Sequence, residues 1–531
     1  MKICYIWVKK FRNLENFEIS LSSEHEFHYE MSTHSISRVD KNKLPDNFFY
    51  DGITDVSALI GENGSGKSNC IELICMVLKG GKSRVKSDFI IITEDNGYFT
   101  THQNFSNSTP AAYNNFEATN ERYDRSISGI NVIYFSNISD DRQLNFEKSV
   151  SNISINSRDH QTIKFSNQTS FISSERFIKL DINKPEHLLI DVKYYSTGVG
   201  YLYNSRQKDL LSLFTKSLKR KLKELSYNSQ FSTSIIFAII FKLLKLIISK
   251  ENDFPSEDFI VKTFIFQENE RTEHASKRIF EACINHPACE NLPEKESIFS
   301  IKNKIDSHEF EIIDEDIKKS GLAINFILEY NNIKNKKLID ILVTFFENDY
   351  LIKCTWWGLS SGHTAYLTLF SSIYCELKRT RNDAIVLIDE GDLYLHPKWQ
   401  IEFLEKLTTV LPSLSTGNIQ LVLTSHSPFL ISDLPRQCIT ILKSQNNKAM
   451  IVSDHLKSMT FGANLYELYS DAFFLGSKRT GTFAQKKIEY ILEKIDNNYS
   501  NKNNINELIN YTRIIGDKII NHHLLEVLKN D

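Results

Sequence analysis

The stretch "GENGSGKSN", residues 61–69, lies between the apolar run "VSALI" and the helical pattern "KSNCIELICMVLKG". It fits the phosphate-loop pattern G-x-x-x-x-G-K-[ST], in which backbone N–H groups wrap a polyphosphate at a helix N-terminus. We expect Lys67 to reach the β- and γ-phosphates of a nucleotide and Ser68 to ligate Mg²⁺. A chance turn rich in glycine and serine is disfavoured by the flanking strand and helix. The predicted binding residues of the loop are Gly61, Asn63, Gly64, Ser65, Gly66, Lys67, Ser68 and Asn69.

Two apolar strand patterns end in side chains that suit phosphate chemistry. The stretch "AIVLIDE", residues 384–390, predicts a buried strand that delivers Asp389 near Mg²⁺ and Glu390 beside the γ-phosphate, where Glu390 can polarise the attacking water. Two adjacent acids at a strand end are equally typical of a solvated turn. The stretch "LVLTSHSPFL", residues 421–430, predicts a strand that places His426 where it can hydrogen-bond the γ-phosphate. A lone histidine after a strand is usually structural, but its order after the acidic strand favours a catalytic pair, Glu390 and His426.

A second anion site is predicted at "LSSGH", residues 359–363, which precedes the amphipathic pattern "TAYLTLFSSIYCEL". Ser360, Ser361 and Gly362 supply hydroxyls and N–H donors at a helix N-terminus. One polyphosphate does not need two such sites in the same subunit. We therefore expect this site to cap ATP held by a second copy, so that the chain forms a homodimer or a higher homo-oligomer.

The order of these four motifs resembles the ABC-type ATPase family, in particular the soluble branch of RecF, SMC and OLD proteins. The stretch "YIWVKKFRNLENFEISL", residues 5–21, looks like the N-terminal strand pair of that branch, which implies that Arg12 lies near the nucleotide. The stretch "DEGDLYLHPKWQ", residues 389–400, resembles its D-E-P-E-x-x-L-H-P-x-W-Q segment, with Gly391 in the place of the usual proline. The resemblance implies an α/β fold: a P-loop NTPase of ABC-ATPase type, with a mixed sheet, flanking helices and an antiparallel β-lobe.

A narrower resemblance comes from "TFGANLYELYSDAFFLGSKRTGTFAQKKI", residues 460–488, and from "VIYFSN", residues 132–137. Both are similar to PtuA-type ATPases of Septu and retron anti-phage systems. In place of the Q-loop glutamine, "VIYFSN" offers Ser136 and Asn137. The resemblance implies that the nucleotide state of the chain restrains an HNH nuclease of PtuB type until infection. It also implies a retron reverse transcriptase and its msDNA as further partners.

Composition places the chain among cytoplasmic proteins. The net charge is −3, from 63 basic and 66 acidic residues, so any contact with nucleic acid must come from a local patch. The eight scattered cysteines are typical of reduced thiols, and no signal peptide is expected. The apolar stretch "SIIFAIIFKLLKLIIS", residues 234–249, is interrupted by Lys242 and Lys245, which favours a buried helix over a membrane span.

The patterns divide the chain into an ATPase head that is split by a helical insertion. Short strands are expected within residues 150–172, "VSNISINSRDHQTIKFSNQTSFI". The predicted divisions are residues 1–205 for the first part of the head, 206–349 for the helical insertion, 350–490 for the second part of the head and 491–531 for a helical tail.

Several alternatives stay open at this point. The basic residues of "TKSLKRKLKEL", residues 215–225, are typical of a solvated helix face, but they also suit phosphate contacts with DNA or RNA. Cys283, His286 and Cys289 are three potential zinc ligands, or residues that pack at a helix end. Two rival functions are an ATP-gated scaffold with little turnover and a RecF-like DNA-repair ATPase. No acidic metal cluster of a nuclease is found after His426.

Overall fold

The computed structural model describes most of the chain, and the following account is restricted to these residues. They are 1–106, 109–123, 125–138, 144–154, 158–193, 205–250, 257–313, 323–346, 351–452, 459–472, 480–496 and 502–530.

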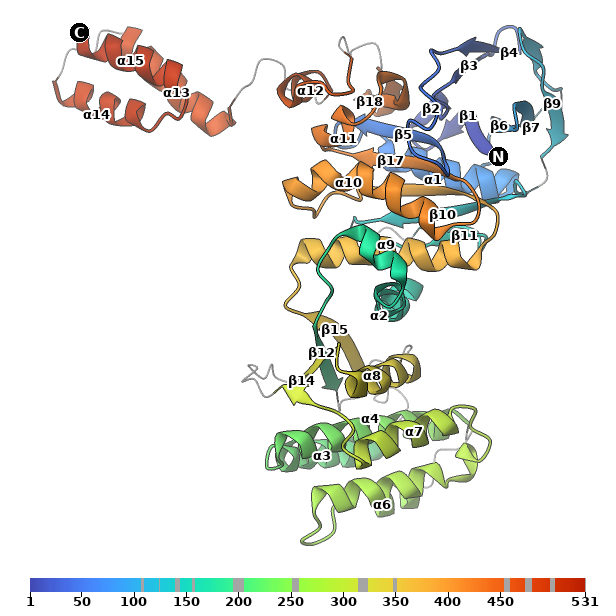
Figure 1. Ribbon diagram of the computed structural model, residues 1–531, viewed down its shortest axis with the longest axis vertical. Helices are drawn as coiled ribbons and strands as arrows, with labels where there is room; N and C mark the ends of the chain where they lie inside the picture. The colour runs from blue at the N-terminus through green and yellow to red at the C-terminus, as the bar shows by residue number, and fades with distance from the viewer. Residues whose placement is uncertain are drawn as a thin grey trace.

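A seven-stranded sheet, with the order β11-β10-β16-β17-β5-β18-β19, forms the centre of the larger part of the molecule (Figure 1). All neighbouring strands in it are parallel except the pair of β18 and β19. Parallel strands are covered on both faces, which is why these segments read as continuous apolar runs. The bounds are β5 (Ile53–Gly61), β10 (Ile130–Ser136), β11 (Val150–Asn152), β16 (Asp383–Asp389), β17 (Ile419–Ser425), β18 (Ile439–Gln445) and β19 (Lys448–Ile451).

One face of this sheet is covered by α1 (Lys67–Lys79), over which a second, five-stranded sheet packs. The order of the second sheet is β2-β1-β6-β7-β9, and a three-stranded sheet, β3-β4-β8, adjoins it. The helix ends as predicted at Gly80, whose N–H donates to the carbonyl of Met76 at 2.8 Å. The bounds are β1 (Lys2–Phe11), β2 (Leu14–Ser20), β3 (His25–Glu30), β4 (Ser35–Asp40), β6 (Phe89–Asp95), β7 (Tyr98–Asn104), β8 (Ala112–Asn114) and β9 (Thr119–Arg122).

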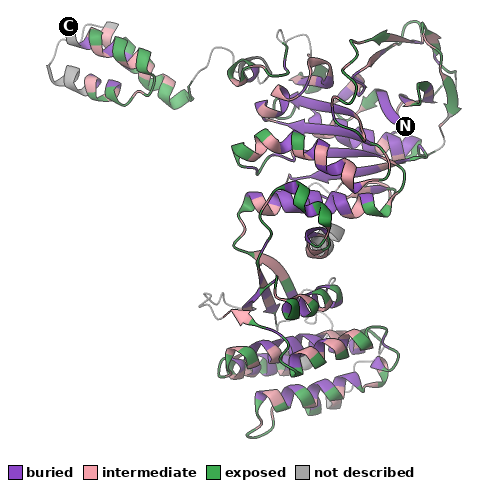
Figure 2. Ribbon diagram, in the orientation of Figure 1, coloured by how far each residue is buried: buried purple, intermediate pink, exposed green. Residues whose placement is uncertain are grey.

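The opposite face is covered by α9 (Ser361–Arg379) and α10 (Pro397–Val410), and α2 (Arg158–Ile172) packs against α9. The expectation of short strands was therefore wrong for the segment of α2. The buried side chain of Gln168 explains the helix, because its Nε2 donates to Thr368 Oγ1 of α9 at 2.9 Å and its Oε1 accepts from Trp356 Nε1 at 3.0 Å. This tertiary contact overrides the local strand pattern. Figure 2 shows the buried residues concentrated in the central sheet and on the inner faces of these helices.

The second part of the molecule combines helices with a four-stranded antiparallel sheet, β13-β14-β12-β15. The region expected to be helical thus contains β14, whose alternating residues "AINFILE" pair with β12 from before the insertion. The bounds are β12 (His187–Lys193), β13 (Ile312–Ile313), β14 (Ala323–Glu329), β15 (Ile352–Trp357), α3 (Ser205–Leu222), α4 (Tyr227–Lys250), α5 (Glu257–Thr263), α6 (Thr272–Ile284), α7 (Lys295–Asp306) and α8 (Ile333–Phe345).

The apolar helix α4 lies at the centre of this second part. Among the described helices it is the one long and apolar enough to cross a membrane, and 78% of its most apolar window is buried within the protein. Lys242 in its middle contacts the ring and the carbonyl of Phe345 on α8. These contacts are those of a core helix.

The C-terminal helices α13 (Thr482–Asp496), α14 (Lys502–Arg513) and α15 (Lys518–Asn530) pack on one another through a small apolar cluster of their own (Figure 1). The remaining short elements are α11 (Pro428–Ser432), α12 (Leu465–Ala472), η1 (Gly81–Ser83), η2 (Glu175–Leu180), η3 (Pro287–Cys289), η4 (Leu411–Leu414) and η5 (Arg436–Cys438).

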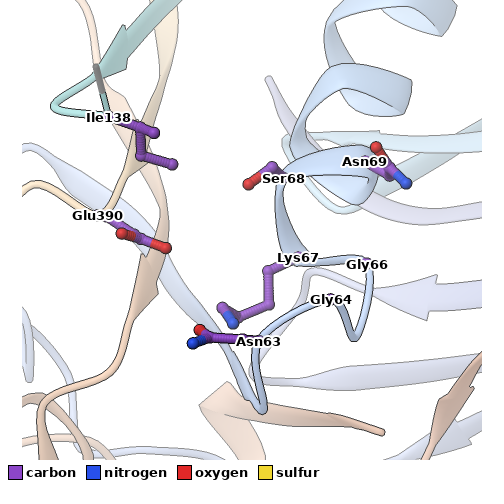
Figure 3. A pocket seen from close by; sticks show the side chains of 8 residues that line it. All are labelled: Asn63, Gly64, Gly66, Lys67, Ser68, Asn69, Ile138 and Glu390. Carbon is purple, nitrogen blue, oxygen red and sulfur yellow. The ribbon is translucent and has the colours of Figure 1, made fainter. Parts of the chain in front are cut away.

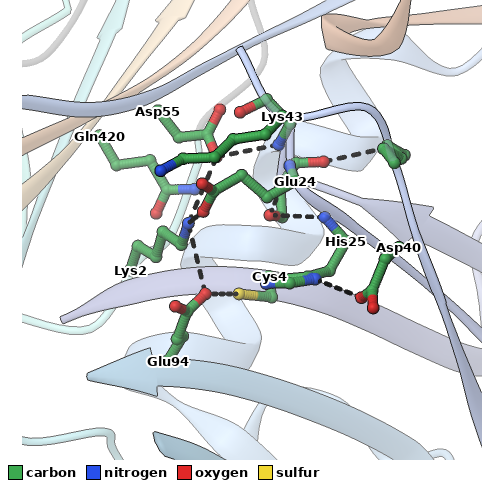
Figure 4. A network of polar contacts seen from close by, with 12 residues as sticks. Lys2, Cys4, Glu24, His25, Asp40, Lys43, Asp55, Glu94 and Gln420 are labelled. Carbon is green, nitrogen blue, oxygen red and sulfur yellow. Dashed lines mark hydrogen bonds and ion pairs between the residues drawn. The ribbon is translucent and has the colours of Figure 1, made fainter. Parts of the chain in front are cut away.

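A buried polar network joins the five-stranded sheet to the central sheet (Figure 4). The Nζ of Lys2 on β1 lies 2.8 Å from Glu24, 3.3 Å from Glu94 and 3.9 Å from Asp55 of β5. Gln420 of β17 accepts from and donates to the backbone of β1, at 2.8 Å in each bond. Ion pairs and hydrogen bonds therefore join the two sheets directly, in addition to the contacts that both make with α1.

Candidate functional site

The loop between β5 and α1 turns tightly because its glycines adopt left-handed backbone conformations. Gly64 has φ of 77° and Gly66 has φ of 103°, which a residue with a side chain rarely adopts. A Cβ on Gly66 would also come within 2.9 Å of the Cβ of Ala449. The loop therefore leads directly into the N-terminus of α1, where unpaired N–H groups and the helix dipole favour an anion.

A pocket of about 310 Å³ opens between this loop and the end of β16, which is small for a ligand site. Figure 3 shows Ser68, Lys67 and Asn63 on one side of it, with Glu390 and Ile138 on the other. The lining residues are Asn63, Gly64, Gly66, Lys67, Ser68, Asn69, Ile138 and Glu390. Seven predicted site residues are thus brought together, and Ile138 is an addition.

Lys67 is buried beneath the loop. Its Nζ donates to the carbonyls of Gly61 at 3.0 Å and Glu62 at 3.1 Å. Burial lowers the pKa of Lys67, and the charges of Glu390 and Asp389 partly offset this effect. An anion in the pocket would stabilise the charged amine further, so the loop fits a polyphosphate.

The two acids at the end of β16 have different surroundings. Asp389 is 1% exposed, and its Oδ1 accepts a hydrogen bond from Thr424 Oγ1 on β17 at 2.5 Å. Glu390 has φ of 51°, a left-handed conformation that is rare outside glycine, and its side chain lines the pocket. The Nε2 of His426 lies 3.4 Å from its Oε1. Of the two acids, Glu390 therefore lines the pocket, and Asp389 is buried directly before it.

The donor set of the pocket suits Mg²⁺ as well as a polyphosphate. Hydroxyl and carboxylate oxygens are the ligands that Mg²⁺ prefers, and Ser68 lies across the pocket from Glu390 (Figure 3). A lysine and a helix N-terminus supply positive charge beside them. The residues present therefore fit the nucleotide and the cation that the sequence predicts.

The predicted second anion site lies outside this pocket. Ser360 caps α9, and its Oγ accepts from the N–H of His363 at 3.2 Å, while Ser360 and Ser361 are exposed. Gly362 packs near Trp399, against which the ring of His363 stands edge-on at 4.5 Å. Ser360, Ser361 and Gly362 do not line the pocket of their own chain.

Arg12 lies beside the pocket but does not line it. Its guanidinium donates to Asn69 Oδ1 at 3.1 Å and to Glu72 Oε1 at 2.5 Å, both on α1. Asn69 in turn lines the pocket and donates to Asn13 at 2.7 Å. The remaining predicted site residues that do not line the pocket are Gly61, Ser65, Asp389 and His426.

The segment after Glu390 is held from two sides. A Cβ on Gly391 would lie 2.4 Å from Ile388 Cγ2 and 2.9 Å from Phe403 Cζ, so a larger residue at this position requires these side chains to shift. Asn137 is buried, and its Nδ2 donates to the carbonyl of Gly391 at 3.2 Å. Asp392 is also buried, and it accepts from Ser425 Oγ at 2.5 Å.

Thr424 and Ser425, whose hydroxyls contact residues 389–392, were not predicted from the sequence. In the sequence they are visible only as two hydroxyl residues at the end of the apolar run "LVLTSH", immediately before His426, and this does not identify the residues that they contact.

Two further sequence alternatives can be followed in the structure. His286 caps η3 by accepting from the N–H of Ala288 at 3.3 Å, and its ring packs on Phe259. Among the described residues, Cys283, His286 and Cys289 do not gather their ligand atoms closely enough to form a metal group. The basic residues Lys216 and Arg220 lie exposed on α3, and Lys223 lies exposed directly after its end.

The chain is similar in sequence to one protein family and to several individual proteins. Residues 56–432 match a family described as "AAA domain, putative AbiEii toxin, Type IV TA system". The "Retron Vc95 probable ATPase" of Vibrio cholerae serotype O1 biovar El Tor is 24% identical over 444 residues, which cover 81% of this chain and 76% of that protein. The "Retron Ec83 probable ATPase" of Escherichia coli is 25% identical and covers 41% of each chain. The "Septu protein PtuA" of Bacillus mycoides (strain KBAB4) is 32% identical over 120 residues, which are 22% of this chain and 16% of that protein.

These matches confirm the resemblance to retron and PtuA-type ATPases that the motifs indicated. The predicted α/β fold of P-loop type, with a mixed sheet and a β-lobe, is confirmed as well.

Proposed function

The chain belongs to the family described as "AAA domain, putative AbiEii toxin, Type IV TA system", and from this premise we propose that it binds ATP with Mg²⁺ and hydrolyses it. The observation that carries the proposal is the pocket in which Lys67 and Ser68 of the loop face Glu390 of the neighbouring strand. A cationic loop with a hydroxyl beside it and a carboxylate opposite it suits a triphosphate and its divalent cation.

In this proposal each residue has a defined role. Lys67 and the N-terminus of α1 bind the phosphates, and Ser68 with Asp389 holds the cation. Mg²⁺, when bound, neutralises the charge that develops on the phosphate oxygens. Glu390 orients the attacking water and accepts its proton, and His426, whose Nε2 lies 3.4 Å from Glu390 Oε1, hydrogen-bonds the γ-phosphate.

Hydrolysis of ATP by the purified chain tests the proposal. Lys67→Ala should abolish ATP binding, whereas Glu390→Gln should bind ATP normally and lose at least about 100-fold in kcat, because the base is absent. Phosphate release would measure the rate and equilibrium binding of a fluorescent ATP analogue the affinity. Unchanged turnover by Glu390→Gln would show that the base is assigned wrongly.

The pocket is completed, in our proposal, by a second copy of the chain. Support comes from the N-terminus of α9, which lies outside the pocket of its own chain: Ser360 and Ser361 are exposed there, and Gly362 is buried behind them. Such a site can cap a nucleotide that another protomer holds. ATP then favours the closed pair, and hydrolysis removes the contacts that both protomers make to the γ-phosphate.

We also propose that this ATP cycle restrains an HNH nuclease of PtuB type in anti-phage defence in the cytoplasm, together with a retron reverse transcriptase and its msDNA. The support is the likeness to retron ATPases and to the Septu protein PtuA. Co-purification of the chain with products of neighbouring genes tests this. DNA-stimulated turnover without a neighbouring nuclease gene would favour the RecF-like repair function, and ATP binding without turnover would favour the scaffold.

A further inference from the structure

Thr424 stands at a position where one hydroxyl reaches both acids of the candidate site. It lies on β17 directly opposite Asp389 in the parallel register of the two strands. Its Oγ1 is 2.5 Å from Asp389 Oδ1 and 2.9 Å from the backbone N of Glu390. The carbonyl of the same threonine is 3.2 Å from that backbone N.

The donor and the acceptor can be assigned for each of the two hydrogen bonds of this hydroxyl. A carboxylate only accepts and a backbone N–H only donates, so Oγ1 donates to Asp389 and accepts from Glu390. Thr424 is 2% exposed, and Asp389 is 1% exposed, so water does not replace either bond readily. Both acids are therefore tied to a single buried side chain.

The hydrogen bonds to Thr424 matter for the site because the backbone of Glu390 has an unusual conformation. Its φ of 51° belongs to a region that a glutamate adopts only when its surroundings impose it. The bonds from its N–H to Thr424 are part of what imposes it. The adjacent Ser425 adds a second tether, because its Oγ donates to the buried Asp392 at 2.5 Å and accepts from the N–H of Ser427 at 2.8 Å.

We propose that Thr424 is a positioning residue for ATP hydrolysis, which holds the Asp389 carboxylate and the left-handed backbone of Glu390 in their working arrangement. This inference rests on the proposed function of the pocket. It adds that the strand carrying His426 also fixes the acids of the neighbouring strand. The pairing of β16 with β17 is thus needed for the geometry of the site.

Two substitutions of Thr424 separate the effect of its hydroxyl from the effect of its side-chain volume. Thr424→Val keeps the shape and removes both hydrogen bonds, so kcat should fall by about tenfold or more, since small displacements of a reacting group are costly. Its affinity for ATP should stay within about threefold, because Lys67 and the loop are untouched. Thr424→Ser retains the hydroxyl and should recover most of the rate.

A readout without nucleotide tests the tether directly. Amide hydrogen exchange in a peptide that spans residues 386–392 should be faster in Thr424→Val than in the wild type, and Thr424→Ser should restore the protection. Thr408→Val is the matched control, because Thr408 is also buried but its hydroxyl contacts only carbonyls of its own helix, at 2.9 and 3.1 Å. The control should change neither kcat nor exchange in this peptide.

The outcomes distinguish the two claims. Wild-type kcat in Thr424→Val, or a loss of rate that Thr424→Ser does not recover, overturns the positioning role. A wild-type chain without turnover contradicts the proposed hydrolysis instead. In that case the exchange experiment decides, and equal protection of the peptide in the wild type and Thr424→Val overturns the tether.

Discussion

At the scale of single residues, the site depends on backbone conformations that few residue types adopt. Gly66 combines φ of 103° with a neighbour 2.9 Å from where a Cβ would lie. Glu390 is also left-handed, but it is a glutamate and is held by contacts from β17. The conformation of the loop thus requires glycine at position 66. The left-handed conformation of Glu390 instead requires its hydrogen bonds to β17.

The substitution Gly66→Ala tests the loop. We expect ATP affinity to fall by at least about tenfold, because both the φ angle and the contact with Ala449 force the loop to move. The free energy of unfolding should fall by about 1–3 kcal/mol in the absence of nucleotide.

Gly516→Ala is the control for this prediction, because a Cβ there meets nothing within 4 Å and its φ is not left-handed. It should change the free energy of unfolding by less than about 0.5 kcal/mol. Calorimetry and titration with a fluorescent ATP analogue measure both quantities. If Gly66→Ala binds ATP as the wild type does, the geometry of the loop is not what binds the phosphates.

The residues of the pocket were predictable where a motif has fixed spacing, as for Lys67, Ser68 and Glu390. Thr424 was not predictable in this way, because a threonine within an apolar strand carries no spacing signal. Its role follows from the register of β16 and β17, which places it opposite Asp389.

At the scale of elements, local patterns predicted helices and strands well where tertiary contacts agreed with them. The strand and helix around the phosphate loop and the helix after "LSSGH" appear where the patterns indicated. The segment of α2 failed, because its strand-like pattern is overridden by packing on α9 through Gln168. β14 was missed inside a helical region, because its partner β12 lies more than 100 residues earlier in the chain.

At the scale of the whole molecule, the polar network of Lys2 and Asp55 joins the two sheets that enclose α1 (Figure 4). Asp55 is fully buried, and burial raises its pKa from 3.8 to about 6, although Lys2 and backbone N–H groups oppose this rise. Lys2 also forms ion pairs with Glu24 and Glu94. A titratable group therefore sits at the junction of the sheets.

This pKa predicts a pH dependence of stability that Asp55→Asn should remove. Since the folded protein binds the Asp55 proton more tightly than the unfolded chain, the contribution of Asp55 is full below about pH 4 and is lost as pH rises through about 6. The free energy of unfolding of the wild type minus that of Asp55→Asn should therefore decrease between these values. Urea denaturation of both proteins at several pH values measures it, and a constant or increasing difference would be contrary to the account.

The central claim at this scale is that one protomer's loop and another protomer's α9 enclose the same nucleotide. The most direct measurement is the mass of the Glu390→Gln chain in solution by light scattering, with and without ATP and Mg²⁺, compared with the same chain carrying Ser361→Arg. We predict that ATP raises the mass of the first protein, and that the second binds ATP with similar affinity but gains no mass. An equal gain in mass by both proteins, or no gain by the first, would contradict the shared site.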